Sequence, residues 1–292
     1  AMRVTGNRMI DMAVATTAAN QSKVATASAE VSSGMRVTKP SDDPQAWATA
    51  QRAAVKRTLS DGAGAALEAG RERLDLVDNA LSSVGENVSS LRELVVQGAN
   101  ASYGPAERAQ LAVKARALLQ GTVAAANTRT ADGEYVLAGT ASLTPPFSAA
   151  GIYSGDATAR SLPITDDATT TGAIAGSELT AAAGVDVLPL FERVAAALDA
   201  NDVTTLQSLL DDIGQATSQV GLARTRTGGT MNVLDGALDA HAALGERLAS
   251  QISNAVETDV IASASNLAKA STALEASRAV TSHIVALVDP TK

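Results

Sequence analysis

Apolar residues recur at alternating three- and four-residue steps near both ends of the chain, which is the spacing of a coiled-coil seam. The N-terminal seam begins at Ile10 and ends at Val31, and the C-terminal seam runs from Val256 to Val288. Many seam positions hold Ala, Ser, Thr or Asn, so each helix alone buries few large side chains. We expect the two ends to pair as a weak coiled coil; two frayed helices without a partner are the alternative.

Between the two ends, the same rhythm predicts long helices. One is predicted from Pro44 to about Asn100, because an unbroken heptad pattern runs from Leu67 to Gly98. Another follows over residues 105–127, and a long seam spans residues 206–248 with imperfect positions at Thr217, Arg224 and Thr227. The expected fold is therefore mainly α: a long antiparallel helical bundle or coiled coil formed by both chain ends, with a small β-rich insertion.

The first two helices are separated by a stretch rich in helix-ending residues. Pro40 biases Lys39 towards an extended backbone, so the first helix should end near Ser33 or Gly34. Acidic and hydroxyl side chains then offer oxygens to unpaired N–H groups, and a second proline suits the first turn of the next helix. The predicted hinge and cap residues are Pro40, Ser41, Asp42, Asp43 and Pro44.

The C-terminal seam contains a matching irregularity. Its steps from Leu248 to Ile252, Val256 and Val260 are three successive fours, which insert one residue relative to the heptad. We interpret this stutter as the counterpart of the Pro40–Pro44 break. It would mark the boundary between a terminal coiled coil and a helical rod.

Residues 129–188 lack the alternating three- and four-residue spacing of the predicted helices. Asp132–Gly133 predicts a turn, residues 134–139 predict a short strand, and Pro145–Pro146 with several glycines separates short segments. These patterns predict three domains: a terminal coiled coil (1–40 plus 258–292), a helical rod (41–140 plus 188–257) and a β-rich insertion (141–187).

Composition narrows the possible partners. Hydrophobic residues make up 46% of the 292 positions, but aromatic residues only 2%, none before Trp47 or after Phe191. This predicts helical seams at the ends and a more compact body between them. The net charge of −8 argues against a nucleic acid or an anionic membrane as partner. With no cysteine, neither disulfides nor thiolate metal sites can form.

The sequence gives little support to an enzymatic function. His241 and His283 are the only histidines, both lie in predicted helices, and no familiar metal, phosphate or nucleophile motif is present. Asp42 and Asp43 could be read as a pair of carboxylates that binds a divalent cation, but helix capping before Pro44 accounts for them better. We therefore predict no enzyme, no catalytic residue, no cofactor and no metal site.

Several motifs together resemble a known family. The Pro40–Pro44 segment, residues 132–140 (Asp-Gly-Glu-Tyr-Val-Leu-Ala-Gly-Thr), Pro146–Phe147, residues 153–156 and residues 257–277 occur in the order and spacing found in bacterial flagellar axial proteins of the flagellin-like family. Residues 132–140 followed by Pro146–Phe147 resemble the members at the hook–filament junction. Leu91–Gln97 resembles flagellin itself, which is the alternative. Residues 285–292 are more polar than the usual family ending.

The resemblance implies a structural subunit that is exported through the flagellar type III apparatus without a cleaved signal peptide. It would sit outside the cell as a ring-like homo-oligomer between hook and filament. The implied partners are copies of itself, a second hook-associated junction protein, flagellin, the export apparatus and a chaperone, with no nucleic acid and no membrane. The seams supply the expected assembly residues: Ile10, Val24, Val31, Val256, Val260, Leu267, Leu274 and Ile284.

Overall fold

The computed structural model describes residues 2–158, 161–165, 168–171 and 174–288. Its elements are α1 (Met2–Ser33), α2 (Pro44–Gly98), α3 (Pro105–Ala126), β1 (Ser161–Thr165), β2 (Ala168–Thr171), a 3-10 turn η1 (Gly176–Leu179), α4 (Pro189–Asp199), α5 (Val203–Val256) and α6 (Val260–Val288). The mainly α prediction is confirmed. Of the polar ending at 285–292, residues 289–292 lie outside the described residues.

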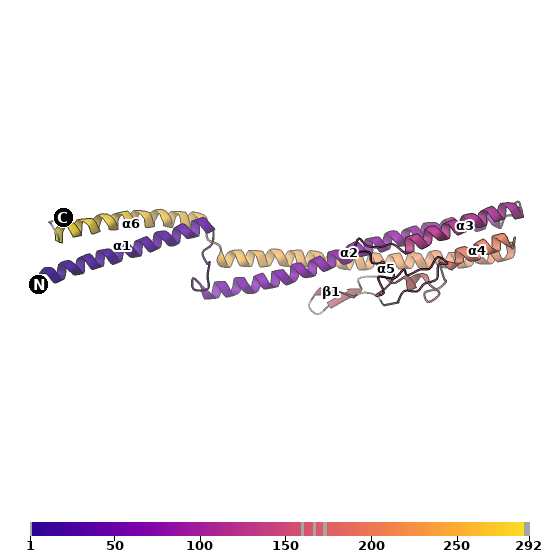
Figure 1. Ribbon diagram of the computed structural model, residues 1–292, viewed down its shortest axis with the longest axis horizontal. Coiled ribbons are helices and arrows are strands. Elements are labelled where there is room, and N and C mark those ends of the chain that lie inside the picture. Colours follow the sequence, from indigo (N-terminus) through magenta and orange to yellow (C-terminus); the bar gives the residue numbers. More distant parts are fainter. Residues whose placement is uncertain (1, 159–160, 166–167, 172–173, 289–292) are drawn as a thin grey trace. The chain divides into compact units, whose positions relative to one another are not determined.

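The chain divides into two compact units. The first unit contains residues 1–59 and 244–292, and the second contains residues 60–243. Within the first unit, α1 and α6 lie side by side and antiparallel (Figure 1). Asn20 of α1 donates to the Ala273 carbonyl at 3.3 Å, and Ser263 of α6 donates to Glu30 at 3.2 Å. The chain ends therefore pair with each other, and they are not frayed single helices.

The second unit is built on the antiparallel α2 and α5, which two ion pairs join. Arg71 contacts Asp235 at 2.9 Å, and Arg224 contacts Asp78 at 2.9 Å. The heptad positions of α2 from Leu67 to Gly98 are all buried. The predicted α2 seam is confirmed. Its burial has a simple cause, since apolar residues repeated every seven positions lie on one face of a helix.

Helices α3 and α4 pack against each other in the second unit and enclose its main core (Figure 1). Phe191 of α4 is fully buried there, with Leu91 and Leu111 of α2 and α3 in the same cluster. Arg108, which is 5% exposed, donates from Nε to the Gly98 carbonyl at 2.6 Å. A buried cation thus closes the C-terminal end of α2, where backbone carbonyls have no helical partner.

The predicted strand at 134–139 is wrong. These residues form turns, with a single bridge between Arg129 and Tyr135, although they are largely buried. Apolar residues here face inward because buried Arg73 donates to the Tyr135 carbonyl at 2.7 Å and holds the segment against α2. Burial without a neighbouring strand produced a pattern that resembles a strand.

The insertion also contains less sheet than predicted. Within its described residues, the strands are the antiparallel pair β1 and β2, which align Ser161 with Thr171. The rest is turns and the short η1, held by side chains such as Gln219 of α5, which donates to the Thr180 and Val185 carbonyls at 3.0 and 3.1 Å. The described part of the segment 141–187 is therefore mostly irregular.

Candidate functional site

The first unit holds the predicted assembly residues, and its α1–α6 seam is thin. Every predicted α1 position from Ile10 to Val31 is buried or half-buried, whereas nearly all the remaining positions between residues 7 and 29 are exposed. The seam includes a Thr17–Thr281 hydroxyl contact at 3.0 Å, and Ala27 is among its most buried side chains at 8% exposed. Small and polar groups at these positions bring the helices together with little apolar burial.

The α6 side of the seam follows the prediction at most positions. Leu274 is 8% exposed, and Leu267 and Ile284 are half-buried. Val260 differs, since it is 51% exposed at the first turn of α6. Val256 is buried, but it ends α5 and packs in a different cluster from the α6 residues. The three-residue gap between α5 and α6 rotates Val260 away from the face that a continuous helix would present.

The two helix breaks lie at the same level and are hydrogen-bonded to each other. Met35 and Glu257 form an antiparallel bridge, and the Arg36 and Val37 amides both donate to the Val256 carbonyl, at 2.8 and 3.2 Å. The Thr258 amide returns a bond to the Gly34 carbonyl at 2.9 Å. The stutter in the C-terminal seam therefore coincides with a true break that is paired with the first one.

The predicted hinge and cap residues have distinct roles. Asp43 accepts a hydrogen bond from the Ala46 amide at 3.0 Å, which caps α2, and this bond together with Arg36 lowers the pKa of Asp43. Asp42 instead accepts from the backbone amides of Thr38 and Lys39, and the Thr38 bond is the main cause of its lowered pKa.

The prolines and Ser41 complete this joint. Pro44 begins α2, as predicted, while Pro40 and Ser41 lie in an exposed turn. Two residues that sequence reasoning missed hold the joint together. Val37 is 1% exposed beside Trp47 and Val256, and Arg36 reaches both Asp43 at 3.2 Å and the Ala255 carbonyl at 3.0 Å. The alternation of small and charged residues around Gly34 gave no signal for either.

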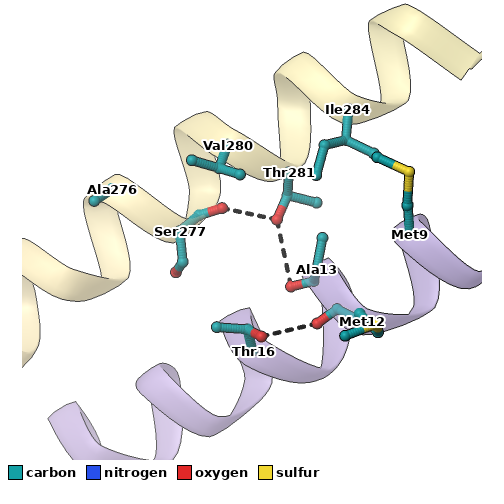
Figure 2. A pocket seen from close by; sticks show the side chains of 9 residues that line it. All are labelled: Met9, Met12, Ala13, Thr16, Ala276, Ser277, Val280, Thr281 and Ile284. Atoms are coloured by element: carbon teal, nitrogen blue, oxygen red, sulfur yellow. Dashed lines mark hydrogen bonds between the residues drawn. The ribbon is translucent and has the colours of Figure 1, made fainter.

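Large apolar side chains remain exposed on α1 and α6. Met12 is 71% exposed, Ile261 84% and Leu287 70%. Between the two helices lies an open, largely apolar groove of about 410 Å³ (Figure 2). Its lining residues are Met9, Met12, Ala13, Thr16, Ala276, Ser277, Val280, Thr281 and Ile284. Such a surface is costly to leave in water and is typical of an interface that a protein partner covers.

Comparison with known proteins agrees with this arrangement. Residues 4–142 match the bacterial flagellin N-terminal helical region. The hook-associated protein 3 of Escherichia coli is 29% identical over 119 residues, 41% of this chain and 38% of that protein. The Salmonella typhimurium protein of the same name is 28% identical over 127 residues, 43% of this chain and 40% of the relative. The first half of the chain is therefore similar to the N-terminal helical region of bacterial flagellin.

Solved structures show the same fold along most of the chain. The Xanthomonas campestris FlgL structure has a TM-score of 0.61 at 21% identity and covers 70% of this chain and 99% of that one. The flagellar junction protein FlgL of Legionella pneumophila has a TM-score of 0.57 at 17% identity, covering 72% and 100%. By contrast, the sequence matches span less than half the length of the curated relatives. The fold is that of these flagellar protein structures.

As far as the structure describes the chain, the two histidines do not lie among potential metal-binding groups. His241 of α5 is half-buried; its Nδ1 lies 2.8 Å from the Ser60 hydroxyl, and its Nε2 lies 2.9 Å from the Ile164 carbonyl. His283 is exposed on α6. Among the described residues, no three His, Asp or Glu side chains gather as metal ligands. No helix in the described part is long and apolar enough to cross a membrane.

Proposed function

We propose that this chain is a structural subunit of the bacterial flagellum, an adaptor at the hook–filament junction that assembles through its terminal helices. The single observation that carries the junction assignment is that both curated relatives are named hook-associated protein 3, and neither is named flagellin. The Legionella structure with the same fold is likewise named a junction protein. Flagellin remains the alternative, because the matched N-terminal region takes its name from flagellin.

The first unit supports assembly through α1 and α6. Its seam buries mainly small side chains, so the helix pair gains little from its own packing. Exposed apolar side chains such as Met12 and Ile261 would gain more if neighbouring subunits covered them. Ordering of a weak helix pair upon association is coupled folding and binding, which also discourages assembly before export.

The proposed assembly surface therefore consists of the predicted assembly residues and the exposed apolar side chains of α1 and α6. The proposed assembly residues are Ile10, Val24, Val31, Val256, Val260, Leu267, Leu274 and Ile284, of which Val256 and Val260 lie outside the α1–α6 seam. The proposed domains keep the predicted boundaries, at the paired helix breaks. The two compact units divide elsewhere, between residues 59 and 60 and between residues 243 and 244, so the breaks lie inside the first unit. The proposed partners are further copies of the chain in a ring, a second hook-associated junction protein, flagellin, the type III export apparatus and a chaperone.

Deletion of the gene tests the junction role. We expect bare hooks by electron microscopy, with flagellin released into the medium as monomers. Intact filaments would refute an essential junction role. Loss of the bulk filament protein itself would identify the chain as flagellin.

Substitutions in α6 test the assembly mechanism. Leu267→Asp or Leu274→Asp places a carboxylate on the seam, and we expect export and a folded second unit but no incorporation. Thr272→Asp introduces the same charge at an exposed position of α6 and serves as the control. Normal incorporation of either seam variant would overturn the role of the terminal helices.

A further inference from the structure

The sulfur atoms of this chain are concentrated at one end. Four of its five methionines lie within the first 35 residues, and it has no cysteine. Met9 and Met12 of α1 are 52% and 71% exposed, and both line the groove between α1 and α6. Figure 2 shows the Met9 side chain extending towards Ile284 of α6. The surface proposed to be covered during assembly thus carries two accessible thioethers.

We propose that Met9 and Met12 form an oxidation-sensitive site through which peroxides block the covering of this groove. The inference rests on the proposed assembly function. In the reaction, a thioether sulfur attacks one peroxide oxygen, the O–O bond breaks, an S=O bond forms and water leaves. The sulfur loses two electrons and the peroxide gains them, so hydrogen peroxide alone balances the step.

The groove offers no ready partner for the new sulfoxide oxygen, which accepts hydrogen bonds but cannot donate them. Its three lining hydroxyls already lie against backbone carbonyls: Thr16 donates to Met12 at 2.8 Å, Ser277 to Leu274 at 2.9 Å, and Thr281 to Ser277 at 2.7 Å. The remaining lining side chains are apolar. In the open groove, water satisfies the oxygen; once a neighbour covers the groove, it would be buried without a donor.

Exposure predicts the order in which the four methionines with described side chains react. Met12 and Met9 should react first, Met35 at 45% exposed should follow, and half-buried Met231 should react last. Met231 packs against the Leu67–Leu234 cluster of the second unit and so provides an internal control. Peptide mass spectrometry after graded peroxide treatment measures the order, and oxidation of Met231 as early as Met12 would contradict the site.

Binding of purified protein to hooks isolated from a strain that lacks the gene tests the consequence. Peroxide treatment should weaken binding of the wild type by roughly tenfold, the effect of one buried unsatisfied acceptor. The double variant Met9→Leu, Met12→Leu should bind equally well before and after treatment. Met9→Gln with Met12→Gln, which mimics the polar product, should bind weakly without peroxide while keeping the wild-type helix content by circular dichroism.

The outcomes distinguish failure of the oxidation site from failure of the proposed junction function. Full binding by oxidised wild type, or an equal loss in the leucine variant, overturns the oxidation site and leaves the junction function standing. A Met231→Leu variant should remain as sensitive as wild type, and its protection would place the sensitivity elsewhere. Failure of untreated wild type to bind hooks refutes the proposed function, and the oxidation site with it.

Discussion

Leu274→Ala tests how the α1–α6 pair is held together. Leu274 is 8% exposed and is one of the few large side chains in a seam of small residues. Truncation of a buried leucine costs about 2–5 kcal/mol, and the lower end applies here because two helices enclose the site only partly and can relax around it. We therefore expect the free energy of opening of α1 and α6 to fall by about 2–3 kcal/mol.

Native-state hydrogen exchange measures this opening for each helix. The expected loss corresponds to roughly 30- to 150-fold faster exchange of amides in α1 and α6, up to the limit of the pair's own stability. Amides of the main core around Phe191 should keep their wild-type rates, because the residues of that core are all in the second unit. Leu287→Ala is the matched control, since that leucine is 70% exposed on the same helix.

Two results would refute this reasoning. If exchange in the second unit accelerated as much as in α1 and α6, the two units would unfold together. If Leu287→Ala accelerated exchange as strongly as Leu274→Ala, helix propensity rather than seam burial would govern the pair. Strong protection of wild-type α1 and α6 in a verified monomer would also contradict a marginal pair.

Two further perturbations test the joint and the second unit. Folding lowers the pKa of Asp43 below 3.8, so the stabilisation that this carboxylate provides is complete above its unfolded-state pKa and is lost as the pH falls through its folded-state pKa. An acid titration followed by circular dichroism should show this loss of stability. The Asp43→Asn variant should lose less stability over the same pH range. Arg108→Met removes bonds to the Gly98 and Asn100 carbonyls and should destabilise the second unit by about 3 kcal/mol in thermal unfolding, whereas a shift near zero would mean that water replaces the arginine.

The regular helices could be predicted because their signal is local and periodic. The seven-residue repeat from Leu67 to Gly98 and the seam of α1 fix which face each helix buries, whatever partner covers it. The break at Pro40–Pro44 follows from proline geometry and from Asp43 as a cap. The stutter before Val260 likewise indicated where the last helix begins.

Other features depended on contacts between distant residues. Burial of Arg73, Arg108 and Gln219 is tolerable because backbone carbonyls from other segments meet their donors, and no local pattern records that meeting. The apolar run at 134–139 forms turns because Arg73 and the helices enclose it, whereas a strand would need a neighbour to pair with.

The features of the candidate site likewise include some that local sequence predicts and some that depend on long-range contacts. The seams, the two breaks and the small residues that make the terminal pair weak could be predicted, because each depends on the order of residues along one helix. The folded structure was needed to show that the breaks bond to each other through Arg36 and Val256, that Val260 leaves the seam, and that Met9 and Met12 face an open groove with Ile284. Those outcomes require the register of α1 against α6, which long-range packing sets and a seven-residue period leaves free.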